Sequence, residues 1–361
     1  MKTKFRLPVR DAILKRNTYE TPAEGRFGKV RLDFNENTTG CGPAVMKALR
    51  KLSPKQLAMY PEYAKPVSRI ASYFGVATGE LLLTNGGDDA LRVFFDAFVE
   101  PGSHILICEP TFPMYRYYTE IAGGRIETLR YDANMEFPLQ EFIAALRKKP
   151  RVIFIANPNN PTGTLLQRGV IKKILMAASE TVVVIDEAYA EFSGVTVLPW
   201  IRKYPQLFVT RTFSKAAGLA GLRLGAVMAG RESLALLRRA MPPFPVNIAA
   251  LAAAEAAVSE GGAVQSYVKQ TRKIRDWFAG ELERIGVKVF PSAGNFLLAN
   301  FGRSGPALFR TLAGQGILLR DRSADIGPGF VRITIGTNAE MKKLLEAIKK
   351  KLGAKSGSKG E

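Results

Sequence analysis

The sequence predicts an α/β protein in which a large domain, built on a mostly parallel central sheet, is followed by a smaller α+β domain. Short, wholly apolar runs recur along the chain, separated by segments long enough for a helix. Such runs are typical of strands that helices cover on both faces of a parallel sheet. From about residue 262 onward, strands and helices follow one another without a long series of these runs. That change of pattern favours a second, smaller domain.

The helices and strands before the central sheet are predicted from the spacing of their apolar residues and from the positions of proline and glycine. Residues 1–30 show no clear period and are expected to form an N-terminal arm that packs with the small domain or with a partner subunit. Alternation over residues 30–34 predicts a short strand, and a proline at the first turn predicts a helix over about 43–49. Another helix is expected over residues 66–74.

Five apolar runs predict the central strands, at residues 81–84, 105–108, 152–156, 182–185 and 207–209. Each run ends in polar, glycine or proline residues, and open α/β sheets bind their ligands at the carboxyl ends of the strands. We therefore expect these residues to meet in one place. Later elements are helices at about 248–258, 264–285, 307–314 and 340–352, and strands at 287–290, 295–299, 317–319 and 331–335. The resulting boundaries are 31–261 for the large domain, 262–352 for the small domain and 353–361 for a flexible tail.

Composition narrows the class of protein. Apolar residues at 47% and charged residues at 23% are ordinary for a globular protein, and no apolar run is long enough to span a membrane. Two cysteines favour a reducing cytoplasm, and a single histidine argues against a metal cluster or a histidine-based hydrolase. The net charge of +20 is spread over the whole length, so a solvated basic surface is favoured over a nucleic-acid site.

The segment from Thr212 to Gly225 carries the strongest chemical signal. Lys215 directly follows Ser214 in a glycine-punctuated loop, and Arg223 lies eight positions on. A second positive charge there can hold an anion and make the lysine easier to deprotonate. A neutral amine beside a hydroxyl and an arginine is what pyridoxal phosphate requires for its covalent attachment.

Other strand ends offer the groups that this cofactor needs. Gly87 and Asp88 precede a helix whose N–H groups can bind a phosphate, together with Thr212, Ser214 and Arg223. Glycine-rich turns of this kind are most often plain turns, so this signal is weak on its own.

The cofactor ring makes separate demands. Asp186 ends an apolar strand, where it can pair with a protonated ring nitrogen or cap the next helix. Asn160 and Tyr189 can donate to the ring oxygen, and Tyr115 either stacks on the ring or is an ordinary aromatic residue. Arg332, inside an apolar strand, is either a solvated edge charge or a carboxylate clamp.

Together these motifs resemble a known family. The segments at 160–163, 186–189, 214–225 and 331–336 look like those of the pyridoxal-phosphate-dependent fold-type I aminotransferases, in order and spacing. The segments at 32–37, 60–61, 109–115, 211–215, 295–296 and 320–321 resemble more narrowly the histidinol-phosphate aminotransferase branch.

The resemblance implies specific roles. Lys215 would hold pyridoxal 5'-phosphate and move the substrate proton, Asp186 would pair with the ring nitrogen, and Tyr189 with Asn160 would bind the ring oxygen. Tyr115 would stack on the ring, while Gly87, Asp88, Thr212, Ser214 and Arg223 would bind the phosphate. Tyr60 would reach the cofactor of a neighbouring subunit, which implies a homodimer. Arg332 would clamp the carboxylate of glutamate, and Arg320, Tyr19 and Asn37 would complete the substrate site.

The implied reaction passes an amino group between histidinol phosphate and 2-oxoglutarate, a step of histidine biosynthesis. The alternatives on the same scaffold are an aromatic amino acid aminotransferase and a phospho-amino-acid decarboxylase. A catalytically silent cofactor-binding regulator is the alternative outside enzymes, although the arm before residue 30 is too short for a DNA-binding domain. Thr38, Gly87 and Asp89 depart from the residues common in the branch and loosen the assignment of substrate.

Overall fold

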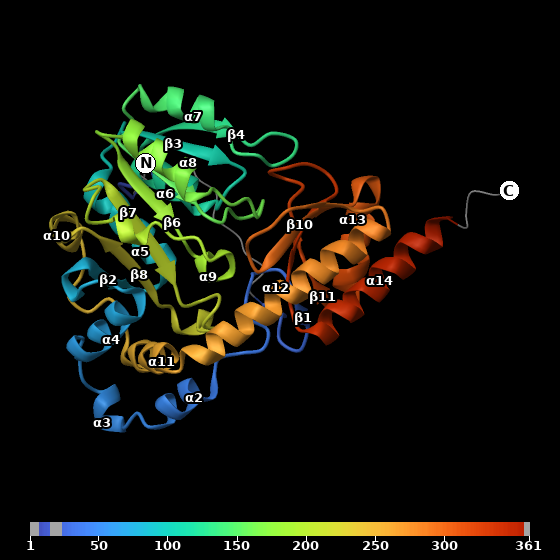
Figure 1. Ribbon diagram of the computed structural model, residues 1–361, viewed down its shortest axis with the longest axis horizontal. Coiled ribbons are helices and arrows are strands. Elements are labelled where there is room, and N and C mark those ends of the chain that lie inside the picture. The colour runs from blue at the N-terminus through green and yellow to red at the C-terminus, as the bar shows by residue number, and fades with distance from the viewer. Residues whose placement is uncertain (1–6, 15–23, 357–361) are drawn as a thin grey trace, which may run out of the picture.

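The computed structural model describes residues 7–14 and 24–356 of the chain and shows a large α/β unit beside a smaller unit that holds the C-terminal helices (Figure 1). The helices are α1 (Asp11–Leu14), α2 (Pro43–Arg50), α3 (Pro54–Leu57), α4 (Ala64–Phe74), α5 (Gly86–Phe98), α6 (Met114–Ala122), α7 (Leu139–Leu146), α8 (Arg168–Ala177), α9 (Ala190–Ser193), α10 (Arg231–Arg238), α11 (Ile248–Ser259), α12 (Gly261–Arg284), α13 (Gly305–Gly314) and α14 (Asn338–Ser356). The strands are β1 (Val30–Arg31), β2 (Leu81–Thr84), β3 (His104–Glu109), β4 (Arg125–Arg130), β5 (Val152–Ala156), β6 (Val182–Asp186), β7 (Leu207–Thr212), β8 (Gly225–Ala229), β9 (Lys288–Phe290), β10 (Phe296–Asn300), β11 (Ile317–Leu318), β12 (Arg320–Asp321) and β13 (Phe330–Thr334).

A seven-stranded sheet in the order β2-β8-β7-β6-β5-β3-β4 forms the centre of the large unit. Strands β3 to β7 pair in parallel, and β8 is antiparallel to both of its neighbours. Because β2 and β7 both oppose β8, they run in the same direction, and the five predicted strands end at one edge. The prediction of a mostly parallel sheet is confirmed.

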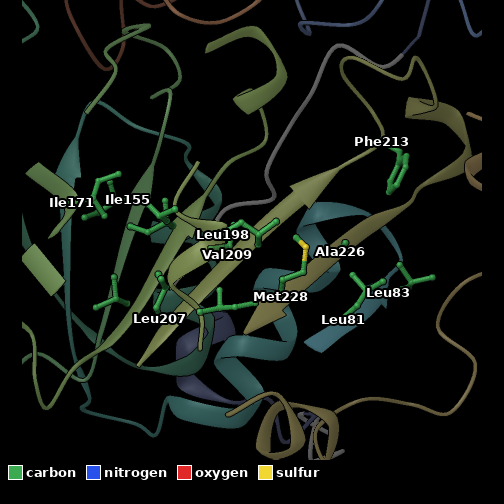
Figure 2. Packing of buried hydrophobic residues seen from close by; sticks show 14 of the residues in the cluster. Leu81, Leu83, Ile155, Ile171, Leu198, Leu207, Val209, Phe213, Ala226 and Met228 are labelled. Carbon is green, nitrogen blue, oxygen red and sulfur yellow. The ribbon is translucent and has the colours of Figure 1, made fainter. Parts of the chain in front are cut away.

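Side chains of these strands alternate between two buried layers, because successive residues of a strand point to opposite faces. Ile155, Val209 and Met228 belong to the layer drawn in Figure 2, which α8 and α11 also line. Phe154 and Val227 belong to the layer on the opposite face, under α5 and α10. Cover on both faces explains why the sequence of each strand is apolar throughout.

The small unit has its own core. Strands in the order β12-β13-β10-β9 form an antiparallel sheet, against which α12, α13 and α14 bury Phe278, Leu312 and Leu344. In Figure 1, α12 runs from the large unit along the small one, with α14 beside it. This α+β arrangement agrees with the predicted class of the second domain.

The first strand belongs to the small unit rather than to the large one. Val30 pairs with Ile317 of β11, and Leu32 is fully buried in the small unit's core. The expected start of the large domain at residue 31 therefore differs from the observed pairing. The sequence could not show this, because a short alternating strand does not identify its partner across almost 290 residues.

Both ends of the chain also differ from expectation. The described part of the arm packs on the large unit, where Arg10 Nη2 donates a hydrogen bond of 2.7 Å to the carbonyl of Ile121 on α6. Helix α14 continues to Ser356, through the start of the expected flexible tail.

The structure also contains a strand that sequence analysis did not single out, since β4 pairs in parallel with β3 at the edge of the large sheet. Among the described residues, no helix is long and apolar enough to cross a membrane.

Candidate active site

A cavity of about 470 Å³ opens at the carboxyl edge of the large sheet, where the small unit meets it. It is lined by Phe34, Glu36, Gly87, Asp88, Phe112, Pro113, Met114, Ala156, Asn160, Asp186, Ala188, Tyr189, Thr210, Arg211, Thr212, Ser214, Lys215, Ala220, Gly221, Arg223, Arg320, Arg322 and Arg332. Basic side chains outnumber acidic ones in this wall, which favours anionic ligands. The strand ends thus converge as the sequence predicted.

Lys215 faces the cavity, and among the residues that the structure describes it forms no ion pair with a carboxylate. Its Nζ donates a hydrogen bond of 2.9 Å to the carbonyl oxygen of Phe34 and lies 6.0 Å from the centre of the Tyr189 ring. Burial, helped by the positive charge of Arg332, lowers the pKa of Lys215 to about 8. A substantial fraction of this amine is therefore neutral near physiological pH, as a nucleophile requires.

The loop after Lys215 must approach another segment closely. Gly218 has a φ of +69°, and a Cβ placed there would lie 2.7 Å from the carbonyl oxygen of Gly40. Glycine is therefore needed on both conformational and steric grounds. This contact helps to fix the lysine loop against the segment that follows β1.

Asp186 is a half-buried carboxylate that ends β6 and faces the cavity. Its Oδ2 accepts a hydrogen bond of 2.8 Å from the Tyr115 hydroxyl, and its Oδ1 accepts bonds from Thr210 Oγ1 at 2.9 Å and the Ala188 N–H at 3.2 Å. Burial raises the pKa of Asp186, and these donors oppose the rise. Helix α9 begins only at Ala190, so Asp186 does not act as the helix cap that the sequence left open.

Tyr115 does not offer its face to the cavity, contrary to the sequence-based expectation. Its side chain is fully buried, and its ring stacks on Phe154 with centroids 5.1 Å apart. Phe112 lines the cavity instead. Phe112 and Tyr115 lie three positions apart in one motif. The sequence alone gave no reason to prefer Phe112 as the aromatic residue that faces the cavity.

The predicted phosphate-binding residues come together at one end of the cavity. Gly87, Asp88, Thr212, Ser214 and Arg223 all line it. Helix α5 begins at Gly86, so its first N–H groups point toward this end. Arg223 Nη2 lies 3.2 Å from Asp88 Oδ2, and the Ser214 N–H donates to Thr212 Oγ1 at 3.1 Å.

Arginines of the small unit also line the cavity. Arg332 Nη1 donates a bond of 2.5 Å to Asn160 Oδ1, and its Nη2 donates to the carbonyl of Asp33. Within the described part of the chain, Arg332 Nε has no hydrogen-bond partner, although it is buried. Burial is the main reason that the pKa of Arg332 falls to about 10, and nearby Arg320 and Arg322 add to the fall. Arg332 is thus a buried cation with a free donor, not a solvated edge charge.

Arg320 and Arg322 approach Arg332 from the neighbouring strand. Arg320 is directly opposite Arg332 in the antiparallel pairing of β12 with β13, and all three side chains line the cavity. Sequence analysis did not identify Arg322. The period of two from Arg320 to Arg322 was the signal that could have found it.

Two predicted residues lie elsewhere, and a third is outside the described part of the chain. Asn37 lines a neighbouring cavity, and its Oδ1 accepts a hydrogen bond of 2.9 Å from the Thr39 N–H. Tyr60 is 78% exposed and stacks on Phe244 with centroids 4.6 Å apart. Tyr19 lies outside the described residues.

Tyr189 faces the cavity, and its hydroxyl accepts a hydrogen bond of 2.9 Å from Asn35 Nδ2. The phenol can still donate its own proton toward a ligand. Asn35 was not identified from sequence, because its partner lies 154 residues away.

The residues present fit pyridoxal phosphate. The cavity offers a lysine with a lowered pKa, a half-buried carboxylate with hydrogen-bond donors behind it, and a helix start beside an arginine. The described residues contain no cluster of histidine, cysteine and acidic side chains that could hold a metal ion. Fold and site together define a pyridoxal-phosphate-dependent enzyme of fold type I.

Comparison with known proteins identifies the family. The family described as aminotransferase class I and II matches residues 28–348, so the chain belongs to that family, whose cofactor is pyridoxal 5'-phosphate. The chain is 35% identical over 328 residues to histidinol-phosphate aminotransferase 2 of Legionella pneumophila (strain Lens), covering 89% of each protein. It is 33% identical over 333 residues to histidinol-phosphate aminotransferase of Geobacillus sp. (strain WCH70), covering 90% of this chain and 91% of that one. The predictions of fold, family, cofactor and aminotransferase activity are confirmed.

Solved structures of other proteins share the fold of this chain. The crystal structure of a putative histidinol-phosphate aminotransferase from Erwinia carotovora atroseptica SCRI1043 matches with a TM-score of 0.85 and 26% identity, over 91% of this chain and 97% of that chain. The histidinol-phosphate aminotransferase from Sinorhizobium meliloti, solved in complex with pyridoxal 5'-phosphate, shares the fold with a TM-score of 0.88 and 24% identity, over 98% of this chain and 99% of that chain.

Proposed function

We propose that this aminotransferase passes the amino group of histidinol phosphate to 2-oxoglutarate, forming imidazole-acetol phosphate and glutamate. The observation that carries the proposal is the group of three arginines, Arg320, Arg322 and Arg332, that line the cavity on the two neighbouring strands β12 and β13 and just beyond β12. Relatives at 33–35% identity that bear the name histidinol-phosphate aminotransferase support it.

The arginines argue for an anionic group on the substrate. Like charges placed directly opposite each other on neighbouring strands are destabilising, and Arg320 faces Arg332 in this way. Burial of Arg332 with a free Nε–H adds to that cost. A phosphate or carboxylate bound there would relieve both effects, since arginine binds such groups through two parallel hydrogen bonds.

Each residue of the site has a role in the proposed reaction. Pyridoxal phosphate, when bound, withdraws electrons from the substrate carbon that loses its proton. Lys215 would hold the cofactor covalently and, as a general base, would move the substrate proton. Asp186 would pair with the ring nitrogen, Asn160 and Tyr189 would bind the ring oxygen, and Arg332 would orient the substrate anion. Arg223 and the start of α5 would bind the cofactor phosphate.

A spectrum of the purified protein tests the proposal. Loss of the absorbance of the aldehyde cofactor is expected on adding histidinol phosphate, with recovery on adding 2-oxoglutarate. Phenylalanine and O-phosphothreonine serve as the competing amines. Brisk conversion by phenylalanine without conversion by histidinol phosphate would assign the chain to aromatic amino acids instead. Release of carbon dioxide from O-phosphothreonine would indicate a decarboxylase.

We also propose that the protein is a homodimer in which Tyr60 reaches the partner's cofactor. Tyr60 and Phe244 form an exposed aromatic pair, and Leu57 and Met59 beside Tyr60 are exposed as well, which is typical of a surface that another chain covers. Mixing inactive Lys215→Ala protein with a poorly active Tyr60→Ala variant should restore activity through mixed dimers. No restoration of activity, together with a monomeric mass in solution, would argue against the dimer.

The cytoplasmic location stays a prediction. Both cysteines are free thiols, which suits a reducing compartment.

A further inference from the structure

Tyr115 places its one polar side-chain atom against the catalytic carboxylate. The side chain is fully buried at the start of α6, stacked on Phe154 of β5 and edge-on to Phe112. Its hydroxyl lies 2.8 Å from Asp186 Oδ2. A buried phenol must find a partner for its O–H, and here that partner is the carboxylate that faces the cavity.

A second hydroxyl approaches the same carboxylate from the neighbouring strand. Thr210 Oγ1 lies 2.9 Å from Asp186 Oδ1, which also accepts the Ala188 N–H. Each carboxylate oxygen can accept about two hydrogen bonds. Oδ1 is therefore filled, whereas Oδ2, which accepts from Tyr115 alone among residues 7–14 and 24–356, keeps a lone pair for a ligand.

We propose that the hydroxyls of Tyr115 and Thr210 are positioning groups that hold Asp186 ionised, with the free lone pair of Oδ2 toward the cavity. The inference rests on the proposed pairing of Asp186 with the ring nitrogen of the cofactor. Tyr115 and Thr210 act through Asp186 and do not touch the cofactor themselves in this proposal. For Tyr115, this role differs from the stacking on the cofactor ring that the sequence suggested.

Hydrogen-bond donors are needed to keep Asp186 ionised, because its surroundings favour the protonated form. Burial raises the pKa of Asp186, and the negative charge of Asp88 on α5 raises it further. The Tyr115 and Thr210 hydroxyls and the Ala188 N–H lower it. Tyr189, which follows β6, also faces this carboxylate. A protonated Asp186 would have no charge to offer a protonated ring nitrogen, so loss of a donor weakens the pair.

Tyr115 is suited to be a permanent donor. Burial and the negative charge of Asp186 keep the pKa of its phenol well above the ordinary value. The hydroxyl therefore keeps its proton throughout the pH range in which aminotransferases work. Substitution by phenylalanine removes this one atom and preserves the ring that stacks on Phe154.

The first test uses protein stripped of cofactor, so that it does not depend on activity. The pKa of Asp186 is raised in the folded state, so the stability that comes from protonation is lost as pH rises through that pKa. Tyr115→Phe should raise the pKa further and extend this loss to higher pH. Compared with the unmodified protein, the variant should show a deficit in Tm that grows by about 2 °C between about pH 5 and about pH 8.

A purely structural role predicts something different. Loss of packing or of a neutral hydrogen bond would lower Tm by the same amount at every pH. A deficit that does not change with pH in both Tyr115→Phe and Thr210→Val would overturn the proposal. Tyr118→Phe, on the same helix, is the matched control and should show no pH-dependent deficit.

The second test uses the enzyme with its cofactor. Tyr115→Phe and Thr210→Val should lower kcat by about tenfold, which corresponds to one pKa unit, with KM nearly unchanged. Thr210→Ser restores a hydroxyl at the same place and should recover most of kcat. Unchanged kcat in Tyr115→Phe and Thr210→Val would also refute the inference. If the unmodified protein transaminates but not with histidinol phosphate, the proposed substrate fails and this inference stands, because the variants can be measured with the true amine.

Discussion

Lys215 Nζ donates its hydrogen bond to the carbonyl oxygen of Phe34, 2.9 Å away and 181 residues earlier in the chain. A neutral backbone acceptor holds the amine in place and stabilises its charged form less than a carboxylate would. The segment that begins with β1 thus enters the cavity from the small unit and orients the lysine of the large one. Both units are needed to complete the site.

The reactivity of Lys215 should follow its lowered pKa. In cofactor-free protein, the rate of covalent capture of pyridoxal phosphate should rise about tenfold per pH unit below a pKa of about 8, and then level off.

The lowered pKa of Lys215 also predicts how the stability of the folded protein changes with pH. Because the folded pKa lies below the ordinary 10.5, cofactor-free protein should gain stability between pH 8 and 10.5, a gain that Lys215→Met lacks. Stopped-flow absorbance and thermal unfolding measure these effects. A capture rate that is flat from pH 6 to pH 9 would contradict the role given to burial.

Lys215→Ala should abolish turnover and the yellow chromophore that borohydride reduces onto the protein. The fold should survive, because the change removes a side chain that projects into a cavity and makes one hydrogen bond to a main-chain carbonyl. Circular dichroism and mass spectrometry after reduction check both statements. Normal transamination by the variant would show that another group holds the cofactor.

Asp186→Asn should bind the cofactor yet transaminate about 100-fold more slowly or worse, since the charge opposite the ring nitrogen is lost. The amide also offers one oxygen where two hydroxyl donors now meet a carboxylate, so Tyr115 or Thr210 must turn its hydroxyl around. Single-turnover kinetics separate this slow chemistry from weak binding. Near-normal rates would refute the pairing with the ring nitrogen.

Sequence reasoning located the groups that follow strand ends, because the carboxyl ends of parallel strands share one edge of the sheet. Lys215 and Asp186 were found in this way, whereas Arg332, inside a strand of the small unit, was assigned a role only from the family resemblance. Sequence reasoning named Tyr115 as the residue that stacks on the ring and did not consider Phe112, because sequence does not show which of two aromatic residues near a helix start faces a cavity. It also missed main-chain acceptors such as Phe34, because a carbonyl group has no signature in the sequence.

Thr38 departs from the pattern that the sequence resembles, and the structure gives its side chain a partner. Its hydroxyl donates a bond of 2.7 Å to Glu340 Oε2 at the start of α14, 302 residues away. Thr38→Val should therefore lower the free energy of unfolding by about 1 kcal/mol. Urea denaturation measures it, and a double-mutant cycle with Glu340→Gln tests the pair. Additive effects of the two changes would show that the hydrogen bond does not form in solution.

Gly86, the first residue of α5, is expected to be required for cofactor affinity. Its φ is +84°, which costs a residue with a side chain about 1–2 kcal/mol, and an added Cβ would lie 2.6 Å from Arg223 Nη2. Gly86→Ala should thus displace the arginine from the phosphate end of the cavity. Pyridoxal phosphate affinity should fall about tenfold, in keeping with the loss of one charge-assisted bond. Gly87→Ala is the matched comparison, because its Cβ meets no atom within 4 Å and its N–H is retained, so it should lose less. Equilibrium titration of cofactor-free protein measures both affinities. Equal losses in the two variants would mean that the approach of Arg223 does not decide what position 86 tolerates.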